Sequence, residues 1–166
     1  MRQKRHGIWQ ELTWSGLQDM TQALAAGLID LGVAPGTHVG ILSENRREWV
    51  LAQFGIQAAG AVTVGMYPTS PTAEIDHLVN ASDTEVLVIE DQEQFDKIVD
   101  LGDRAPNLRK LIVIDPKGLR SETYLDLVSF DDLLARGHVV LESHKAQIAA
   151  RVAALAPDDT AMMVFT

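Results

Sequence analysis

The sequence has no cysteine among its 166 residues, few basic residues and no long apolar run without interruption. Without cysteine the chain cannot form a disulfide scaffold, a thiolate nucleophile or a zinc ribbon, and a reducing cytoplasm suits such a sequence. The 14 Lys and Arg residues stand against 23 Asp and Glu, for a net charge of −9. This balance argues against a nucleic-acid or anionic-membrane surface, because either needs a basic patch.

We also find no targeting or membrane signal in the sequence. The basic start, Met1 to Arg5, is not followed by an apolar segment, so we expect no signal peptide. Residues 49–73 carry no charge, but they contain glutamine, glycine and proline, whereas a membrane span needs about 20 predominantly apolar residues. We interpret this stretch as a buried helix followed by a buried strand.

The length predicts one domain or a piece of a larger one, and an apolar fraction of 46% is ordinary for a globular protein. The first clear element is a helix with Ser15 as its N-cap, Gly32 as its left-handed end and a turn at Pro35–Gly36. Its apolar face has three- and four-residue spacing, which is the helical period. The residues of that face are Leu17, Met20, Leu24, Leu28 and Leu31.

Apolar strand runs alternate with helical segments along the rest of the chain. The predicted strands are 39–42, 61–66, 86–89, 111–114 and 161–165. The predicted helices are a sandwiched one at 46–59, one starting at Ser70–Pro71 with Pro71 in its first position, one at 95–101, one capped by Ser129 with Asp132, and a separate one carrying Ile148, Val152 and Leu155. Residues 116–127 are predicted to form a surface loop. The fold class is therefore α/β, a parallel sheet with helices on both faces.

Residue chemistry alone shows no catalytic constellation. The sequence has no glycine-rich nucleotide fingerprint, P-loop, HExxH or GxSxG motif. Five scattered histidines lack the spacing of metal ligands, and we interpret each as a surface or strand-end residue: His6, His38, His77, His138 and His144. Asp131 and Asp132 suit a helix cap, and Asp158 and Asp159 a turn. Trp9 and Trp14 favour a local packing cluster over a ligand groove. We assign no catalytic residue and no metal ligand.

A family resemblance rises above this background. Residues 28–45, followed by Glu48–Trp49 and 57–62, resemble the opening of an adenylate-forming (AMP-forming) acyl-CoA synthetase, with Thr37–His38 in place of the usual Asp-Arg. Residues 7–10 followed by Thr13–Trp14, and residues 65–70 and 88–94, resemble the long-chain fatty acid branch in particular. The similarity follows the whole chain in the right order, which makes it specific although each motif alone is weak.

The last ten residues, 157–166, resemble the strand that feeds the phosphate loop of that family, with Phe165 where tyrosine is usual. There an aromatic-Thr pair opens the sequence Ser-Gly-Thr-Thr-Gly-x-Pro-Lys-Gly, whose backbone N–H groups can surround phosphates. The resemblance implies that Thr166 begins the nucleotide-binding loop and helps to position triphosphate or its Mg²⁺. A strand-terminal threonine without a function of its own is an equally open interpretation.

The resemblance implies that residues 1–166 are a partial N-terminal AMP-binding (adenylation) domain, without the rest of that domain and without the small C-terminal domain. The intact relative would use ATP with Mg²⁺ to convert a carboxylate into acyl-AMP and pyrophosphate, and CoA would then give the thioester and AMP. Fatty acid and CoA are the implied partners in a cytoplasmic enzyme, and we expect the isolated chain to be inactive. The alternatives are a ligase for another carboxylic acid and a stand-alone, non-catalytic α/β binding module.

Overall fold

The computed structural model describes residues 1–5, 7–119, 123 and 125–165. The strands are β1 (Arg2–Arg5), β2 (Ile8–Glu11), β3 (His38–Leu42), β4 (Val62–Met66), β5 (Val86–Ile89), β6 (Lys110–Val113), β7 (Asp126–Ser129) and β8 (Met162–Val164). The helices are α1 (Trp14–Asp30), α2 (Arg47–Ala58), α3 (Thr72–Ala81), α4 (Gln92–Leu101), the short 3₁₀ turn η1 (Gly102–Arg104) and α5 (Phe130–Ala153).

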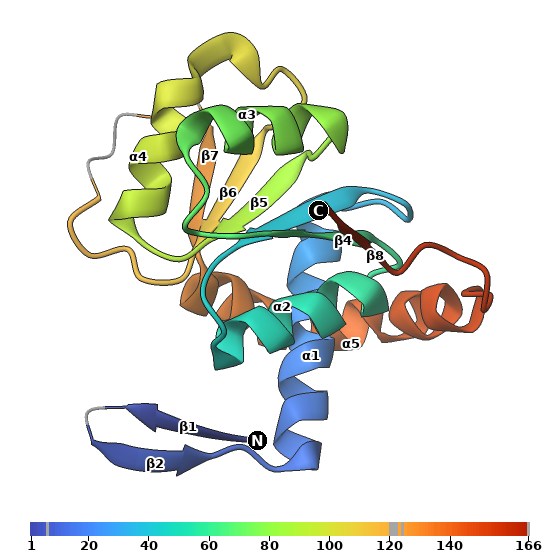
Figure 1. Cartoon of the computed structure of the whole chain (residues 1–166). Coiled ribbons are helices and arrows are strands. Elements are labelled where there is room, and N and C mark those ends of the chain that lie inside the picture. The colour runs from blue at the N-terminus through green and yellow to red at the C-terminus, as the bar shows by residue number, and fades with distance from the viewer. Residues whose placement is uncertain (6, 120–122, 124, 166) are drawn as a thin grey trace.

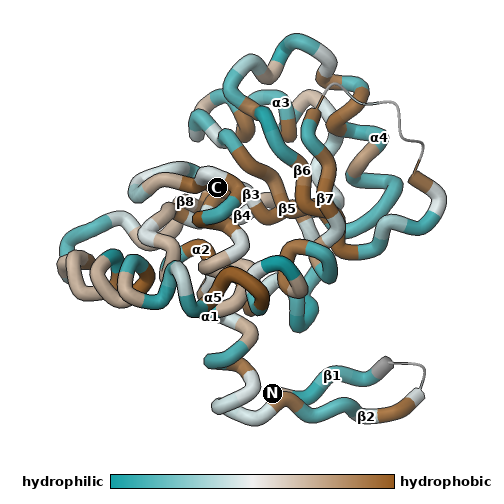
Figure 2. Tube along the Cα trace, turned by 180° about the vertical axis from the view of Figure 1, so that it is seen from behind, coloured by the Kyte–Doolittle hydropathy of each residue, from teal (hydrophilic) through white to brown (hydrophobic). Residues whose placement is uncertain are grey.

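Six strands form one parallel sheet in the order β7-β6-β5-β3-β4-β8, and β1 and β2 form a separate antiparallel hairpin (Figure 1). Helices α1, α2 and α5 cover one face of the large sheet, and α3 and α4 cover the other (Figure 1). The hydropathy of the chain follows this layering, because the strands between the two helical layers are strongly apolar (Figure 2). The predicted fold class is confirmed.

Two hydrophobic cores lie on opposite faces of the sheet, since successive side chains of a strand point to opposite sides. In β5, Val86 and Val88 pack towards α1, α2 and α5, while Leu87 and Ile89 pack towards α3 and α4. Strands buried on both faces give the uninterrupted apolar runs that made them predictable. Among the described residues, no helix combines the length and apolarity that crossing a bilayer requires.

The starts of two helices differ from the prediction. Thr13, not Ser15, is the N-cap of α1: its hydroxyl accepts a hydrogen bond from the Gly16 N–H at 3.1 Å, and Ser15 lies inside the first turn. Pro71 is the N-cap of α3 and not its first helical residue. Gly32 has the left-handed φ of 90° that the sequence predicted, and Gly36 turns with a φ of 79°.

Three predictions about individual elements are wrong. The two helices expected after Ser129 are one continuous helix, α5, which ends at Ala153. The hairpin β1–β2 and strand β7 were not expected, and β7 replaces the end of the loop predicted at 116–127, of which residues 120–122 and 124 lie outside the described part. Helix α2 is buried on one face only, because Phe54 is 41% exposed.

Other local predictions are confirmed or corrected by side-chain contacts. Ser129 caps α5 by accepting a hydrogen bond from the Asp132 N–H at 3.0 Å, and its hydroxyl donates to the Asp132 carboxylate. Asp159 turns the chain after α5, since its carboxylate accepts a hydrogen bond from the Ala156 N–H at 2.7 Å. Trp9 and Trp14 form no packing cluster: both are exposed, at 63% and 83%.

Candidate functional site

The carboxyl ends of the six parallel strands all lie at one end of the strands, which we call the carboxyl edge of the sheet. At this edge the chain leaves β3 towards α2 on one face, whereas it leaves the neighbouring β5 towards α4 on the other face. In open α/β sheets, ligands bind outside the carboxyl ends of the strands where the connections diverge in this way. The loops after β3 and β5 are therefore the first place to look for a site.

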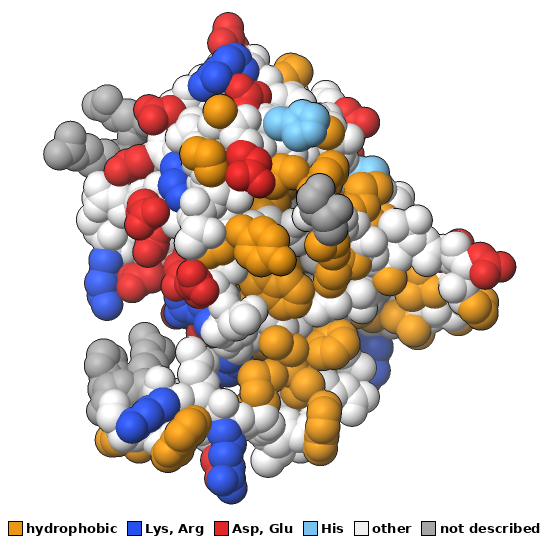
Figure 3. All heavy atoms as spheres, in the orientation of Figure 1, with side chains coloured by type: hydrophobic (Ala, Val, Ile, Leu, Met, Phe, Trp, Pro, Cys, Tyr) orange, Lys and Arg blue, Asp and Glu red, His pale blue; other side chains and the backbone are white. Residues whose placement is uncertain are grey.

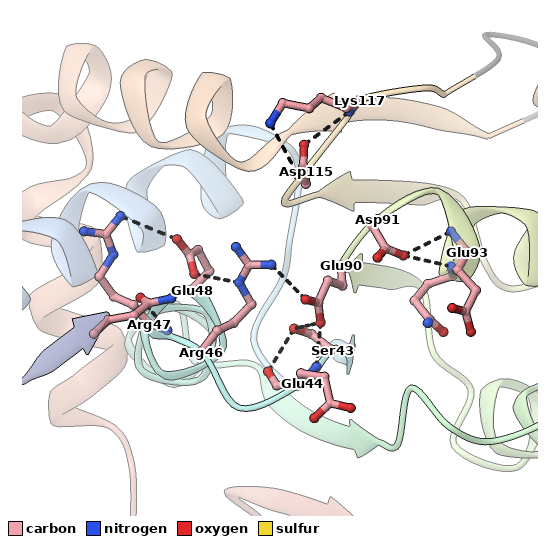
Figure 4. A network of polar contacts seen from close by, with 12 residues as sticks. Ser43, Glu44, Arg46, Arg47, Glu48, Glu90, Asp91, Glu93, Asp115 and Lys117 are labelled. Atoms are coloured by element: carbon pink, nitrogen blue, oxygen red, sulfur yellow. Dashed lines mark hydrogen bonds and ion pairs between the residues drawn. The ribbon is translucent and has the colours of Figure 1, made fainter. Parts of the chain in front are cut away.

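A half-buried carboxylate joins these two loops. Glu90, directly after β5, accepts hydrogen bonds from the Ser43 hydroxyl at 3.1 Å and from the Glu44 N–H at 2.7 Å (Figure 4). Its second oxygen accepts from Arg46 Nη1 at 3.0 Å. Three donor atoms of the loop after β3 are thereby held against the two carboxylate oxygens of Glu90.

The network continues into the start of α2. Arg46 Nε donates to Glu48 Oε2 at 2.8 Å, and Arg47 Nη2 lies 3.5 Å from Glu48 Oε1. Burial alone would raise the pKa of Glu48, but the hydrogen bond from Arg46, a backbone hydrogen bond and both arginine charges together bring it below its ordinary value. Burial lowers the pKa of Arg46, and the two glutamates outweigh that effect and raise it. Both groups therefore stay charged at neutral pH.

A small pocket lies at the same edge, at the ends of β4 and β8. Its volume is about 150 Å³. The lining residues are Gly65, Met66, Tyr67, Glu74, His77, Leu78 and Phe165. Glu74 and His77 come from adjacent turns of α3, and the aromatic Tyr67 and Phe165 follow directly after their strands. The pocket offers aromatic surface with a carboxylate and an imidazole beside it.

A larger apolar groove of about 820 Å³ lies at the opposite, amino edge of the sheet. It runs between the start of β4 and the end of α5, and it includes Val62, Ala154, Leu155 and Ala161. Arg151 in its wall donates from Nη1 to the carbonyl oxygens of Val33 and Ala59, at 2.9 and 2.7 Å, and burial lowers the pKa of its guanidinium. Because these hydrogen bonds connect α5 to the loops after α1 and α2, we infer that Arg151 stabilises the fold.

The described residues contain no cluster of three potential metal ligands. Within residues 1–5, 7–119, 123 and 125–165, no three Asp, Glu or His side chains converge as metal ligands would. Two carboxylates at the carboxyl edge have other partners: Glu90 accepts hydrogen bonds from Arg46, Ser43 and Glu44, and Asp91 caps α4 by accepting from the Glu93 and Gln94 N–H groups.

Thr166, the one nucleotide-binding residue that the sequence suggested, lies outside the described residues. Its neighbour Phe165 is described, packs against the core beneath α3 and α4, and lines the small pocket. His77, interpreted as a surface or strand-end residue, lines the same pocket, and His38 Nδ1 is bonded to the Ser82 carbonyl oxygen. His6 lies outside the described residues.

Sequence reasoning missed the Glu90 network. Ser43 and Glu90 each follow an apolar run directly, which is a usable signal for the carboxyl edge of a parallel sheet. The missing information was the strand order, since only the adjacency of β3 and β5 brings the two runs together.

Comparison with known proteins agrees with this architecture. Long-chain-fatty-acid–CoA ligase FadD15 of Mycobacterium tuberculosis is 32% identical over 160 residues, which are 96% of this chain and 25% of the relative. A Rhodococcus jostii protein named 3-[(3aS,4S,7aS)-7a-methyl-1,5-dioxo-octahydro-1H-inden-4-yl]propanoyl:CoA ligase is also 32% identical, over 93% of this chain and 30% of its own length. This chain thus spans about a quarter to a third of the length of these relatives.

Solved structures show the same fold. A long-chain-fatty-acid-CoA ligase (FadD1) from Archaeoglobus fulgidus superposes with a TM-score of 0.73 at 18% identity, covering 93% of this chain and 27% of that one. The anthranilate CoA ligase AuaEII, solved with anthranoyl-AMP, has a TM-score of 0.67 at 29% identity, covering 76% of this chain and 23% of that one. The family model described as AMP-binding enzyme matches residues 2–166. The chain therefore belongs to the AMP-binding enzyme family of adenylate-forming enzymes.

Proposed function

We propose that this chain is the N-terminal part of the adenylation domain of an ATP-dependent long-chain fatty acid–CoA ligase. In the reaction, a carboxylate oxygen attacks the α-phosphorus of ATP, which releases pyrophosphate and leaves acyl-AMP. The thiol of CoA then attacks the acyl carbon, which gives the thioester and AMP. A cytoplasmic location belongs to this proposal and suits the cysteine-free sequence.

One observation carries the proposal. Strand β8 pairs in parallel with β4 and runs to the carboxyl edge, where Phe165 enters the small pocket and Thr166 follows it in the chain. A loop that starts at this edge has its backbone N–H groups available for phosphate, as in other α/β nucleotide sites. The family match over residues 2–166 supports the same reading.

In this proposal the described residues support the nucleotide loop and take no chemical step. The Glu90 network holds the loop after β3 in place, and β8 carries the chain to the position of Thr166. We assign Thr166 to positioning triphosphate. Because no three potential metal ligands converge in the described residues, we assign Mg²⁺ no ligand among them, although it would neutralise phosphate charge when bound with ATP.

Our choice of acyl substrate rests on the names of the relatives. FadD15 is named for long-chain fatty acids, as are several further relatives from insects and vertebrates. A second candidate substrate, a cyclic carboxylic acid, is favoured by the equal identity to the Rhodococcus ligase. We propose long-chain fatty acids because residues 65–70 and 88–94 also resemble that branch.

The test compares two purified proteins: the complete gene product that contains residues 1–166, and the 166-residue chain itself. We expect the complete product to exchange labelled pyrophosphate into ATP and to form acyl-CoA with palmitate far faster than with benzoate or acetate. The isolated chain should do neither. Turnover by the isolated chain would contradict its proposed dependence on the rest of the protein, and preference for a cyclic acid would contradict the long-chain assignment.

Thr166 is tested in the complete product by T166V, with T160V at an exposed position of the same segment as the matched control. Loss of one positioned hydroxyl near the phosphates should lower kcat roughly tenfold or more, whereas T160V should keep the original rate. Equal rates for both variants would leave Thr166 without a function in nucleotide binding. A stand-alone binding module, the remaining alternative, predicts no ligase activity from any form of the protein.

A further inference from the structure

The β1–β2 hairpin lies apart from the large sheet, at the amino-terminal end of α1 (Figure 1). Its register pairs Arg2 with Glu11 and Lys4 with Trp9, and directly paired residues point to the same face of a hairpin. On the alternate face, Gln3 accepts a hydrogen bond from the Arg47 N–H at 3.3 Å, which turns that face towards α2. Arg2, Lys4 and Trp9 lie on the other face of the hairpin and are exposed there, and Ile8 on the Gln3 face is also 69% exposed.

We define the outward region as this exposed hairpin face, with Arg2, Lys4 and Trp9, together with the exposed Trp14 at the start of α1; it combines indole rings with cations. Trp9 is 63% exposed, and Trp14, the first residue of α1 directly after the hairpin, is 83% exposed. Blue cationic and orange apolar side chains lie next to one another over the hairpin (Figure 3). Exposed tryptophans of this kind are unusual because a buried indole removes a large apolar area from water.

The charge of the hairpin has the opposite sign to that of the chain. Three basic residues lie in positions 2–5, and Glu11 is the single acidic residue before Asp19, whereas the whole chain carries −9. Arg2 and Glu11 form an ion pair at 2.7 Å, but both side chains are well exposed, so solvent screens the pair and a stronger anion can replace it. The overall charge, which argued against a membrane surface, averages over two regions of opposite sign.

We propose that this outward region of the hairpin binds an anionic phospholipid surface. Trp9 and Trp14 fit the bilayer interface because an indole has an apolar body and a polar N–H group. Lys4 and Arg2 complement phosphate headgroups. With two indoles and few cations, the attachment is weak and reversible. It would place the protein where long-chain fatty acids dissolve, but it does not depend on the proposed ligase activity.

The experiment measures flotation of the chain with vesicles of phosphatidylcholine alone or mixed with phosphatidylglycerol, without ATP, CoA or fatty acid. We expect flotation with the anionic vesicles, weaker binding as salt is raised, and quenching of tryptophan fluorescence by brominated acyl chains. Trp49, the third tryptophan, packs against the core and should contribute little to the quenching.

Two variants and two matched controls test the assignment of residues. W9S/W14S and K4E should each weaken binding to anionic vesicles by about tenfold or more. V139S removes an equally exposed apolar side chain from α5, and K145E reverses an exposed lysine there; both should bind as the original chain does. Circular dichroism melting should be unchanged in all four variants, because each side chain is exposed.

Several outcomes would overturn the proposal. Absence of flotation with anionic vesicles is the plainest, and equal binding to neutral vesicles with no effect of K4E would contradict the part given to charge. A chain that forms dimers lost in W9S/W14S, and that ignores vesicles, would assign the region to a second copy instead. Because no substrate is present, failure here leaves the ligase assay unaffected, and failure of the ligase assay leaves vesicle binding measurable.

Discussion

Thr63 in β4 is fully buried, and its hydroxyl has no hydrogen-bond partner in the structure. A hydroxyl that is buried without a partner loses its hydrogen bonds to water and gains none in the folded protein, which lowers stability. T63V replaces the hydroxyl with a methyl group of similar size, and we expect the free energy of unfolding to rise by about 1 kcal/mol. Urea denaturation measures this change.

Thr84 is the matched control for Thr63, since it is equally buried but its hydroxyl lies 2.7 Å from Ser82 Oγ. T84V breaks a satisfied bond and should lower the free energy of unfolding by about 1 kcal/mol. If both variants shift stability in the same direction, the difference in hydrogen bonding does not explain the result.

Glu48 makes the stability of the chain depend on pH. Its pKa is lower in the folded state than the ordinary 4.5, because the hydrogen bonds and arginine charges outweigh the effect of burial. Its contribution is therefore fully present above pH 4.5 and is lost as the pH falls through the lower folded-state pKa. We expect E48Q to be less stable than the original chain at neutral pH, and the difference to shrink in acid.

Denaturation series between neutral and acidic pH measure this dependence for Glu48. E142Q is the control, because Glu142 is exposed in its pair with Lys145 and should show no such trend. A constant difference between E48Q and the original chain at every pH would contradict the assigned pKa shift.

Helices α1 and α5 cross closely because glycine occupies the contact. A Cβ at Gly137 would lie 2.6 Å from the Ala23 carbonyl carbon and 3.2 Å from the Gly27 nitrogen, and these are backbone atoms that cannot move aside cheaply. G137A should therefore lower the free energy of unfolding by about 3 kcal/mol, although alanine favours a helix.

The matched control for Gly137 is its neighbour His138, which is exposed on the same helix. H138A should change the free energy of unfolding by no more than about 0.5 kcal/mol. Thermal melting of the two variants separates them, and a G137A chain as stable as H138A would refute the close crossing.

The sequence predicted those elements whose residues follow one local pattern, such as a continuous apolar run. Residues 86–89 are uniformly apolar because both faces of β5 are buried, so the run itself indicates the strand. Strand β7 (Asp126–Ser129) is an edge strand with two exposed residues, and its pattern looks like a loop. The sequence predicted two helices where α5 is one, and Gly137 within α5 is explained by the close crossing with α1.

The candidate site was predictable only in part, for a similar reason. The resemblance located the segment before Thr166 at the end of a strand, and the structure confirms strand β8 there. The Glu90 network joins residues more than 40 positions apart, and no local pattern shows which strands are neighbours. The small pocket likewise requires α3 to lie beside the ends of β4 and β8.

At the level of the whole molecule, an open edge and exposed apolar surface accompany the family match. Strand β8 pairs with β4 on one side, and Val164, Phe54 and Leu155 are exposed at 60%, 41% and 48%. Such surface favours contact with further protein. The relatives are about three to four times as long as this chain, which agrees with our proposal that it acts within a larger enzyme.

The most direct measurement is to read the coding sequence that follows Thr166. If the chain leads into a nucleotide loop, the next codons should specify Ser-Gly-Thr-Thr-Gly-x-Pro-Lys-Gly or a close variant rich in glycine and small hydroxyl residues. That result would join β8 to a phosphate-binding loop in one polypeptide. A stop codon, or a sequence without glycine and hydroxyl residues, would contradict the proposed ligase and favour a non-catalytic module.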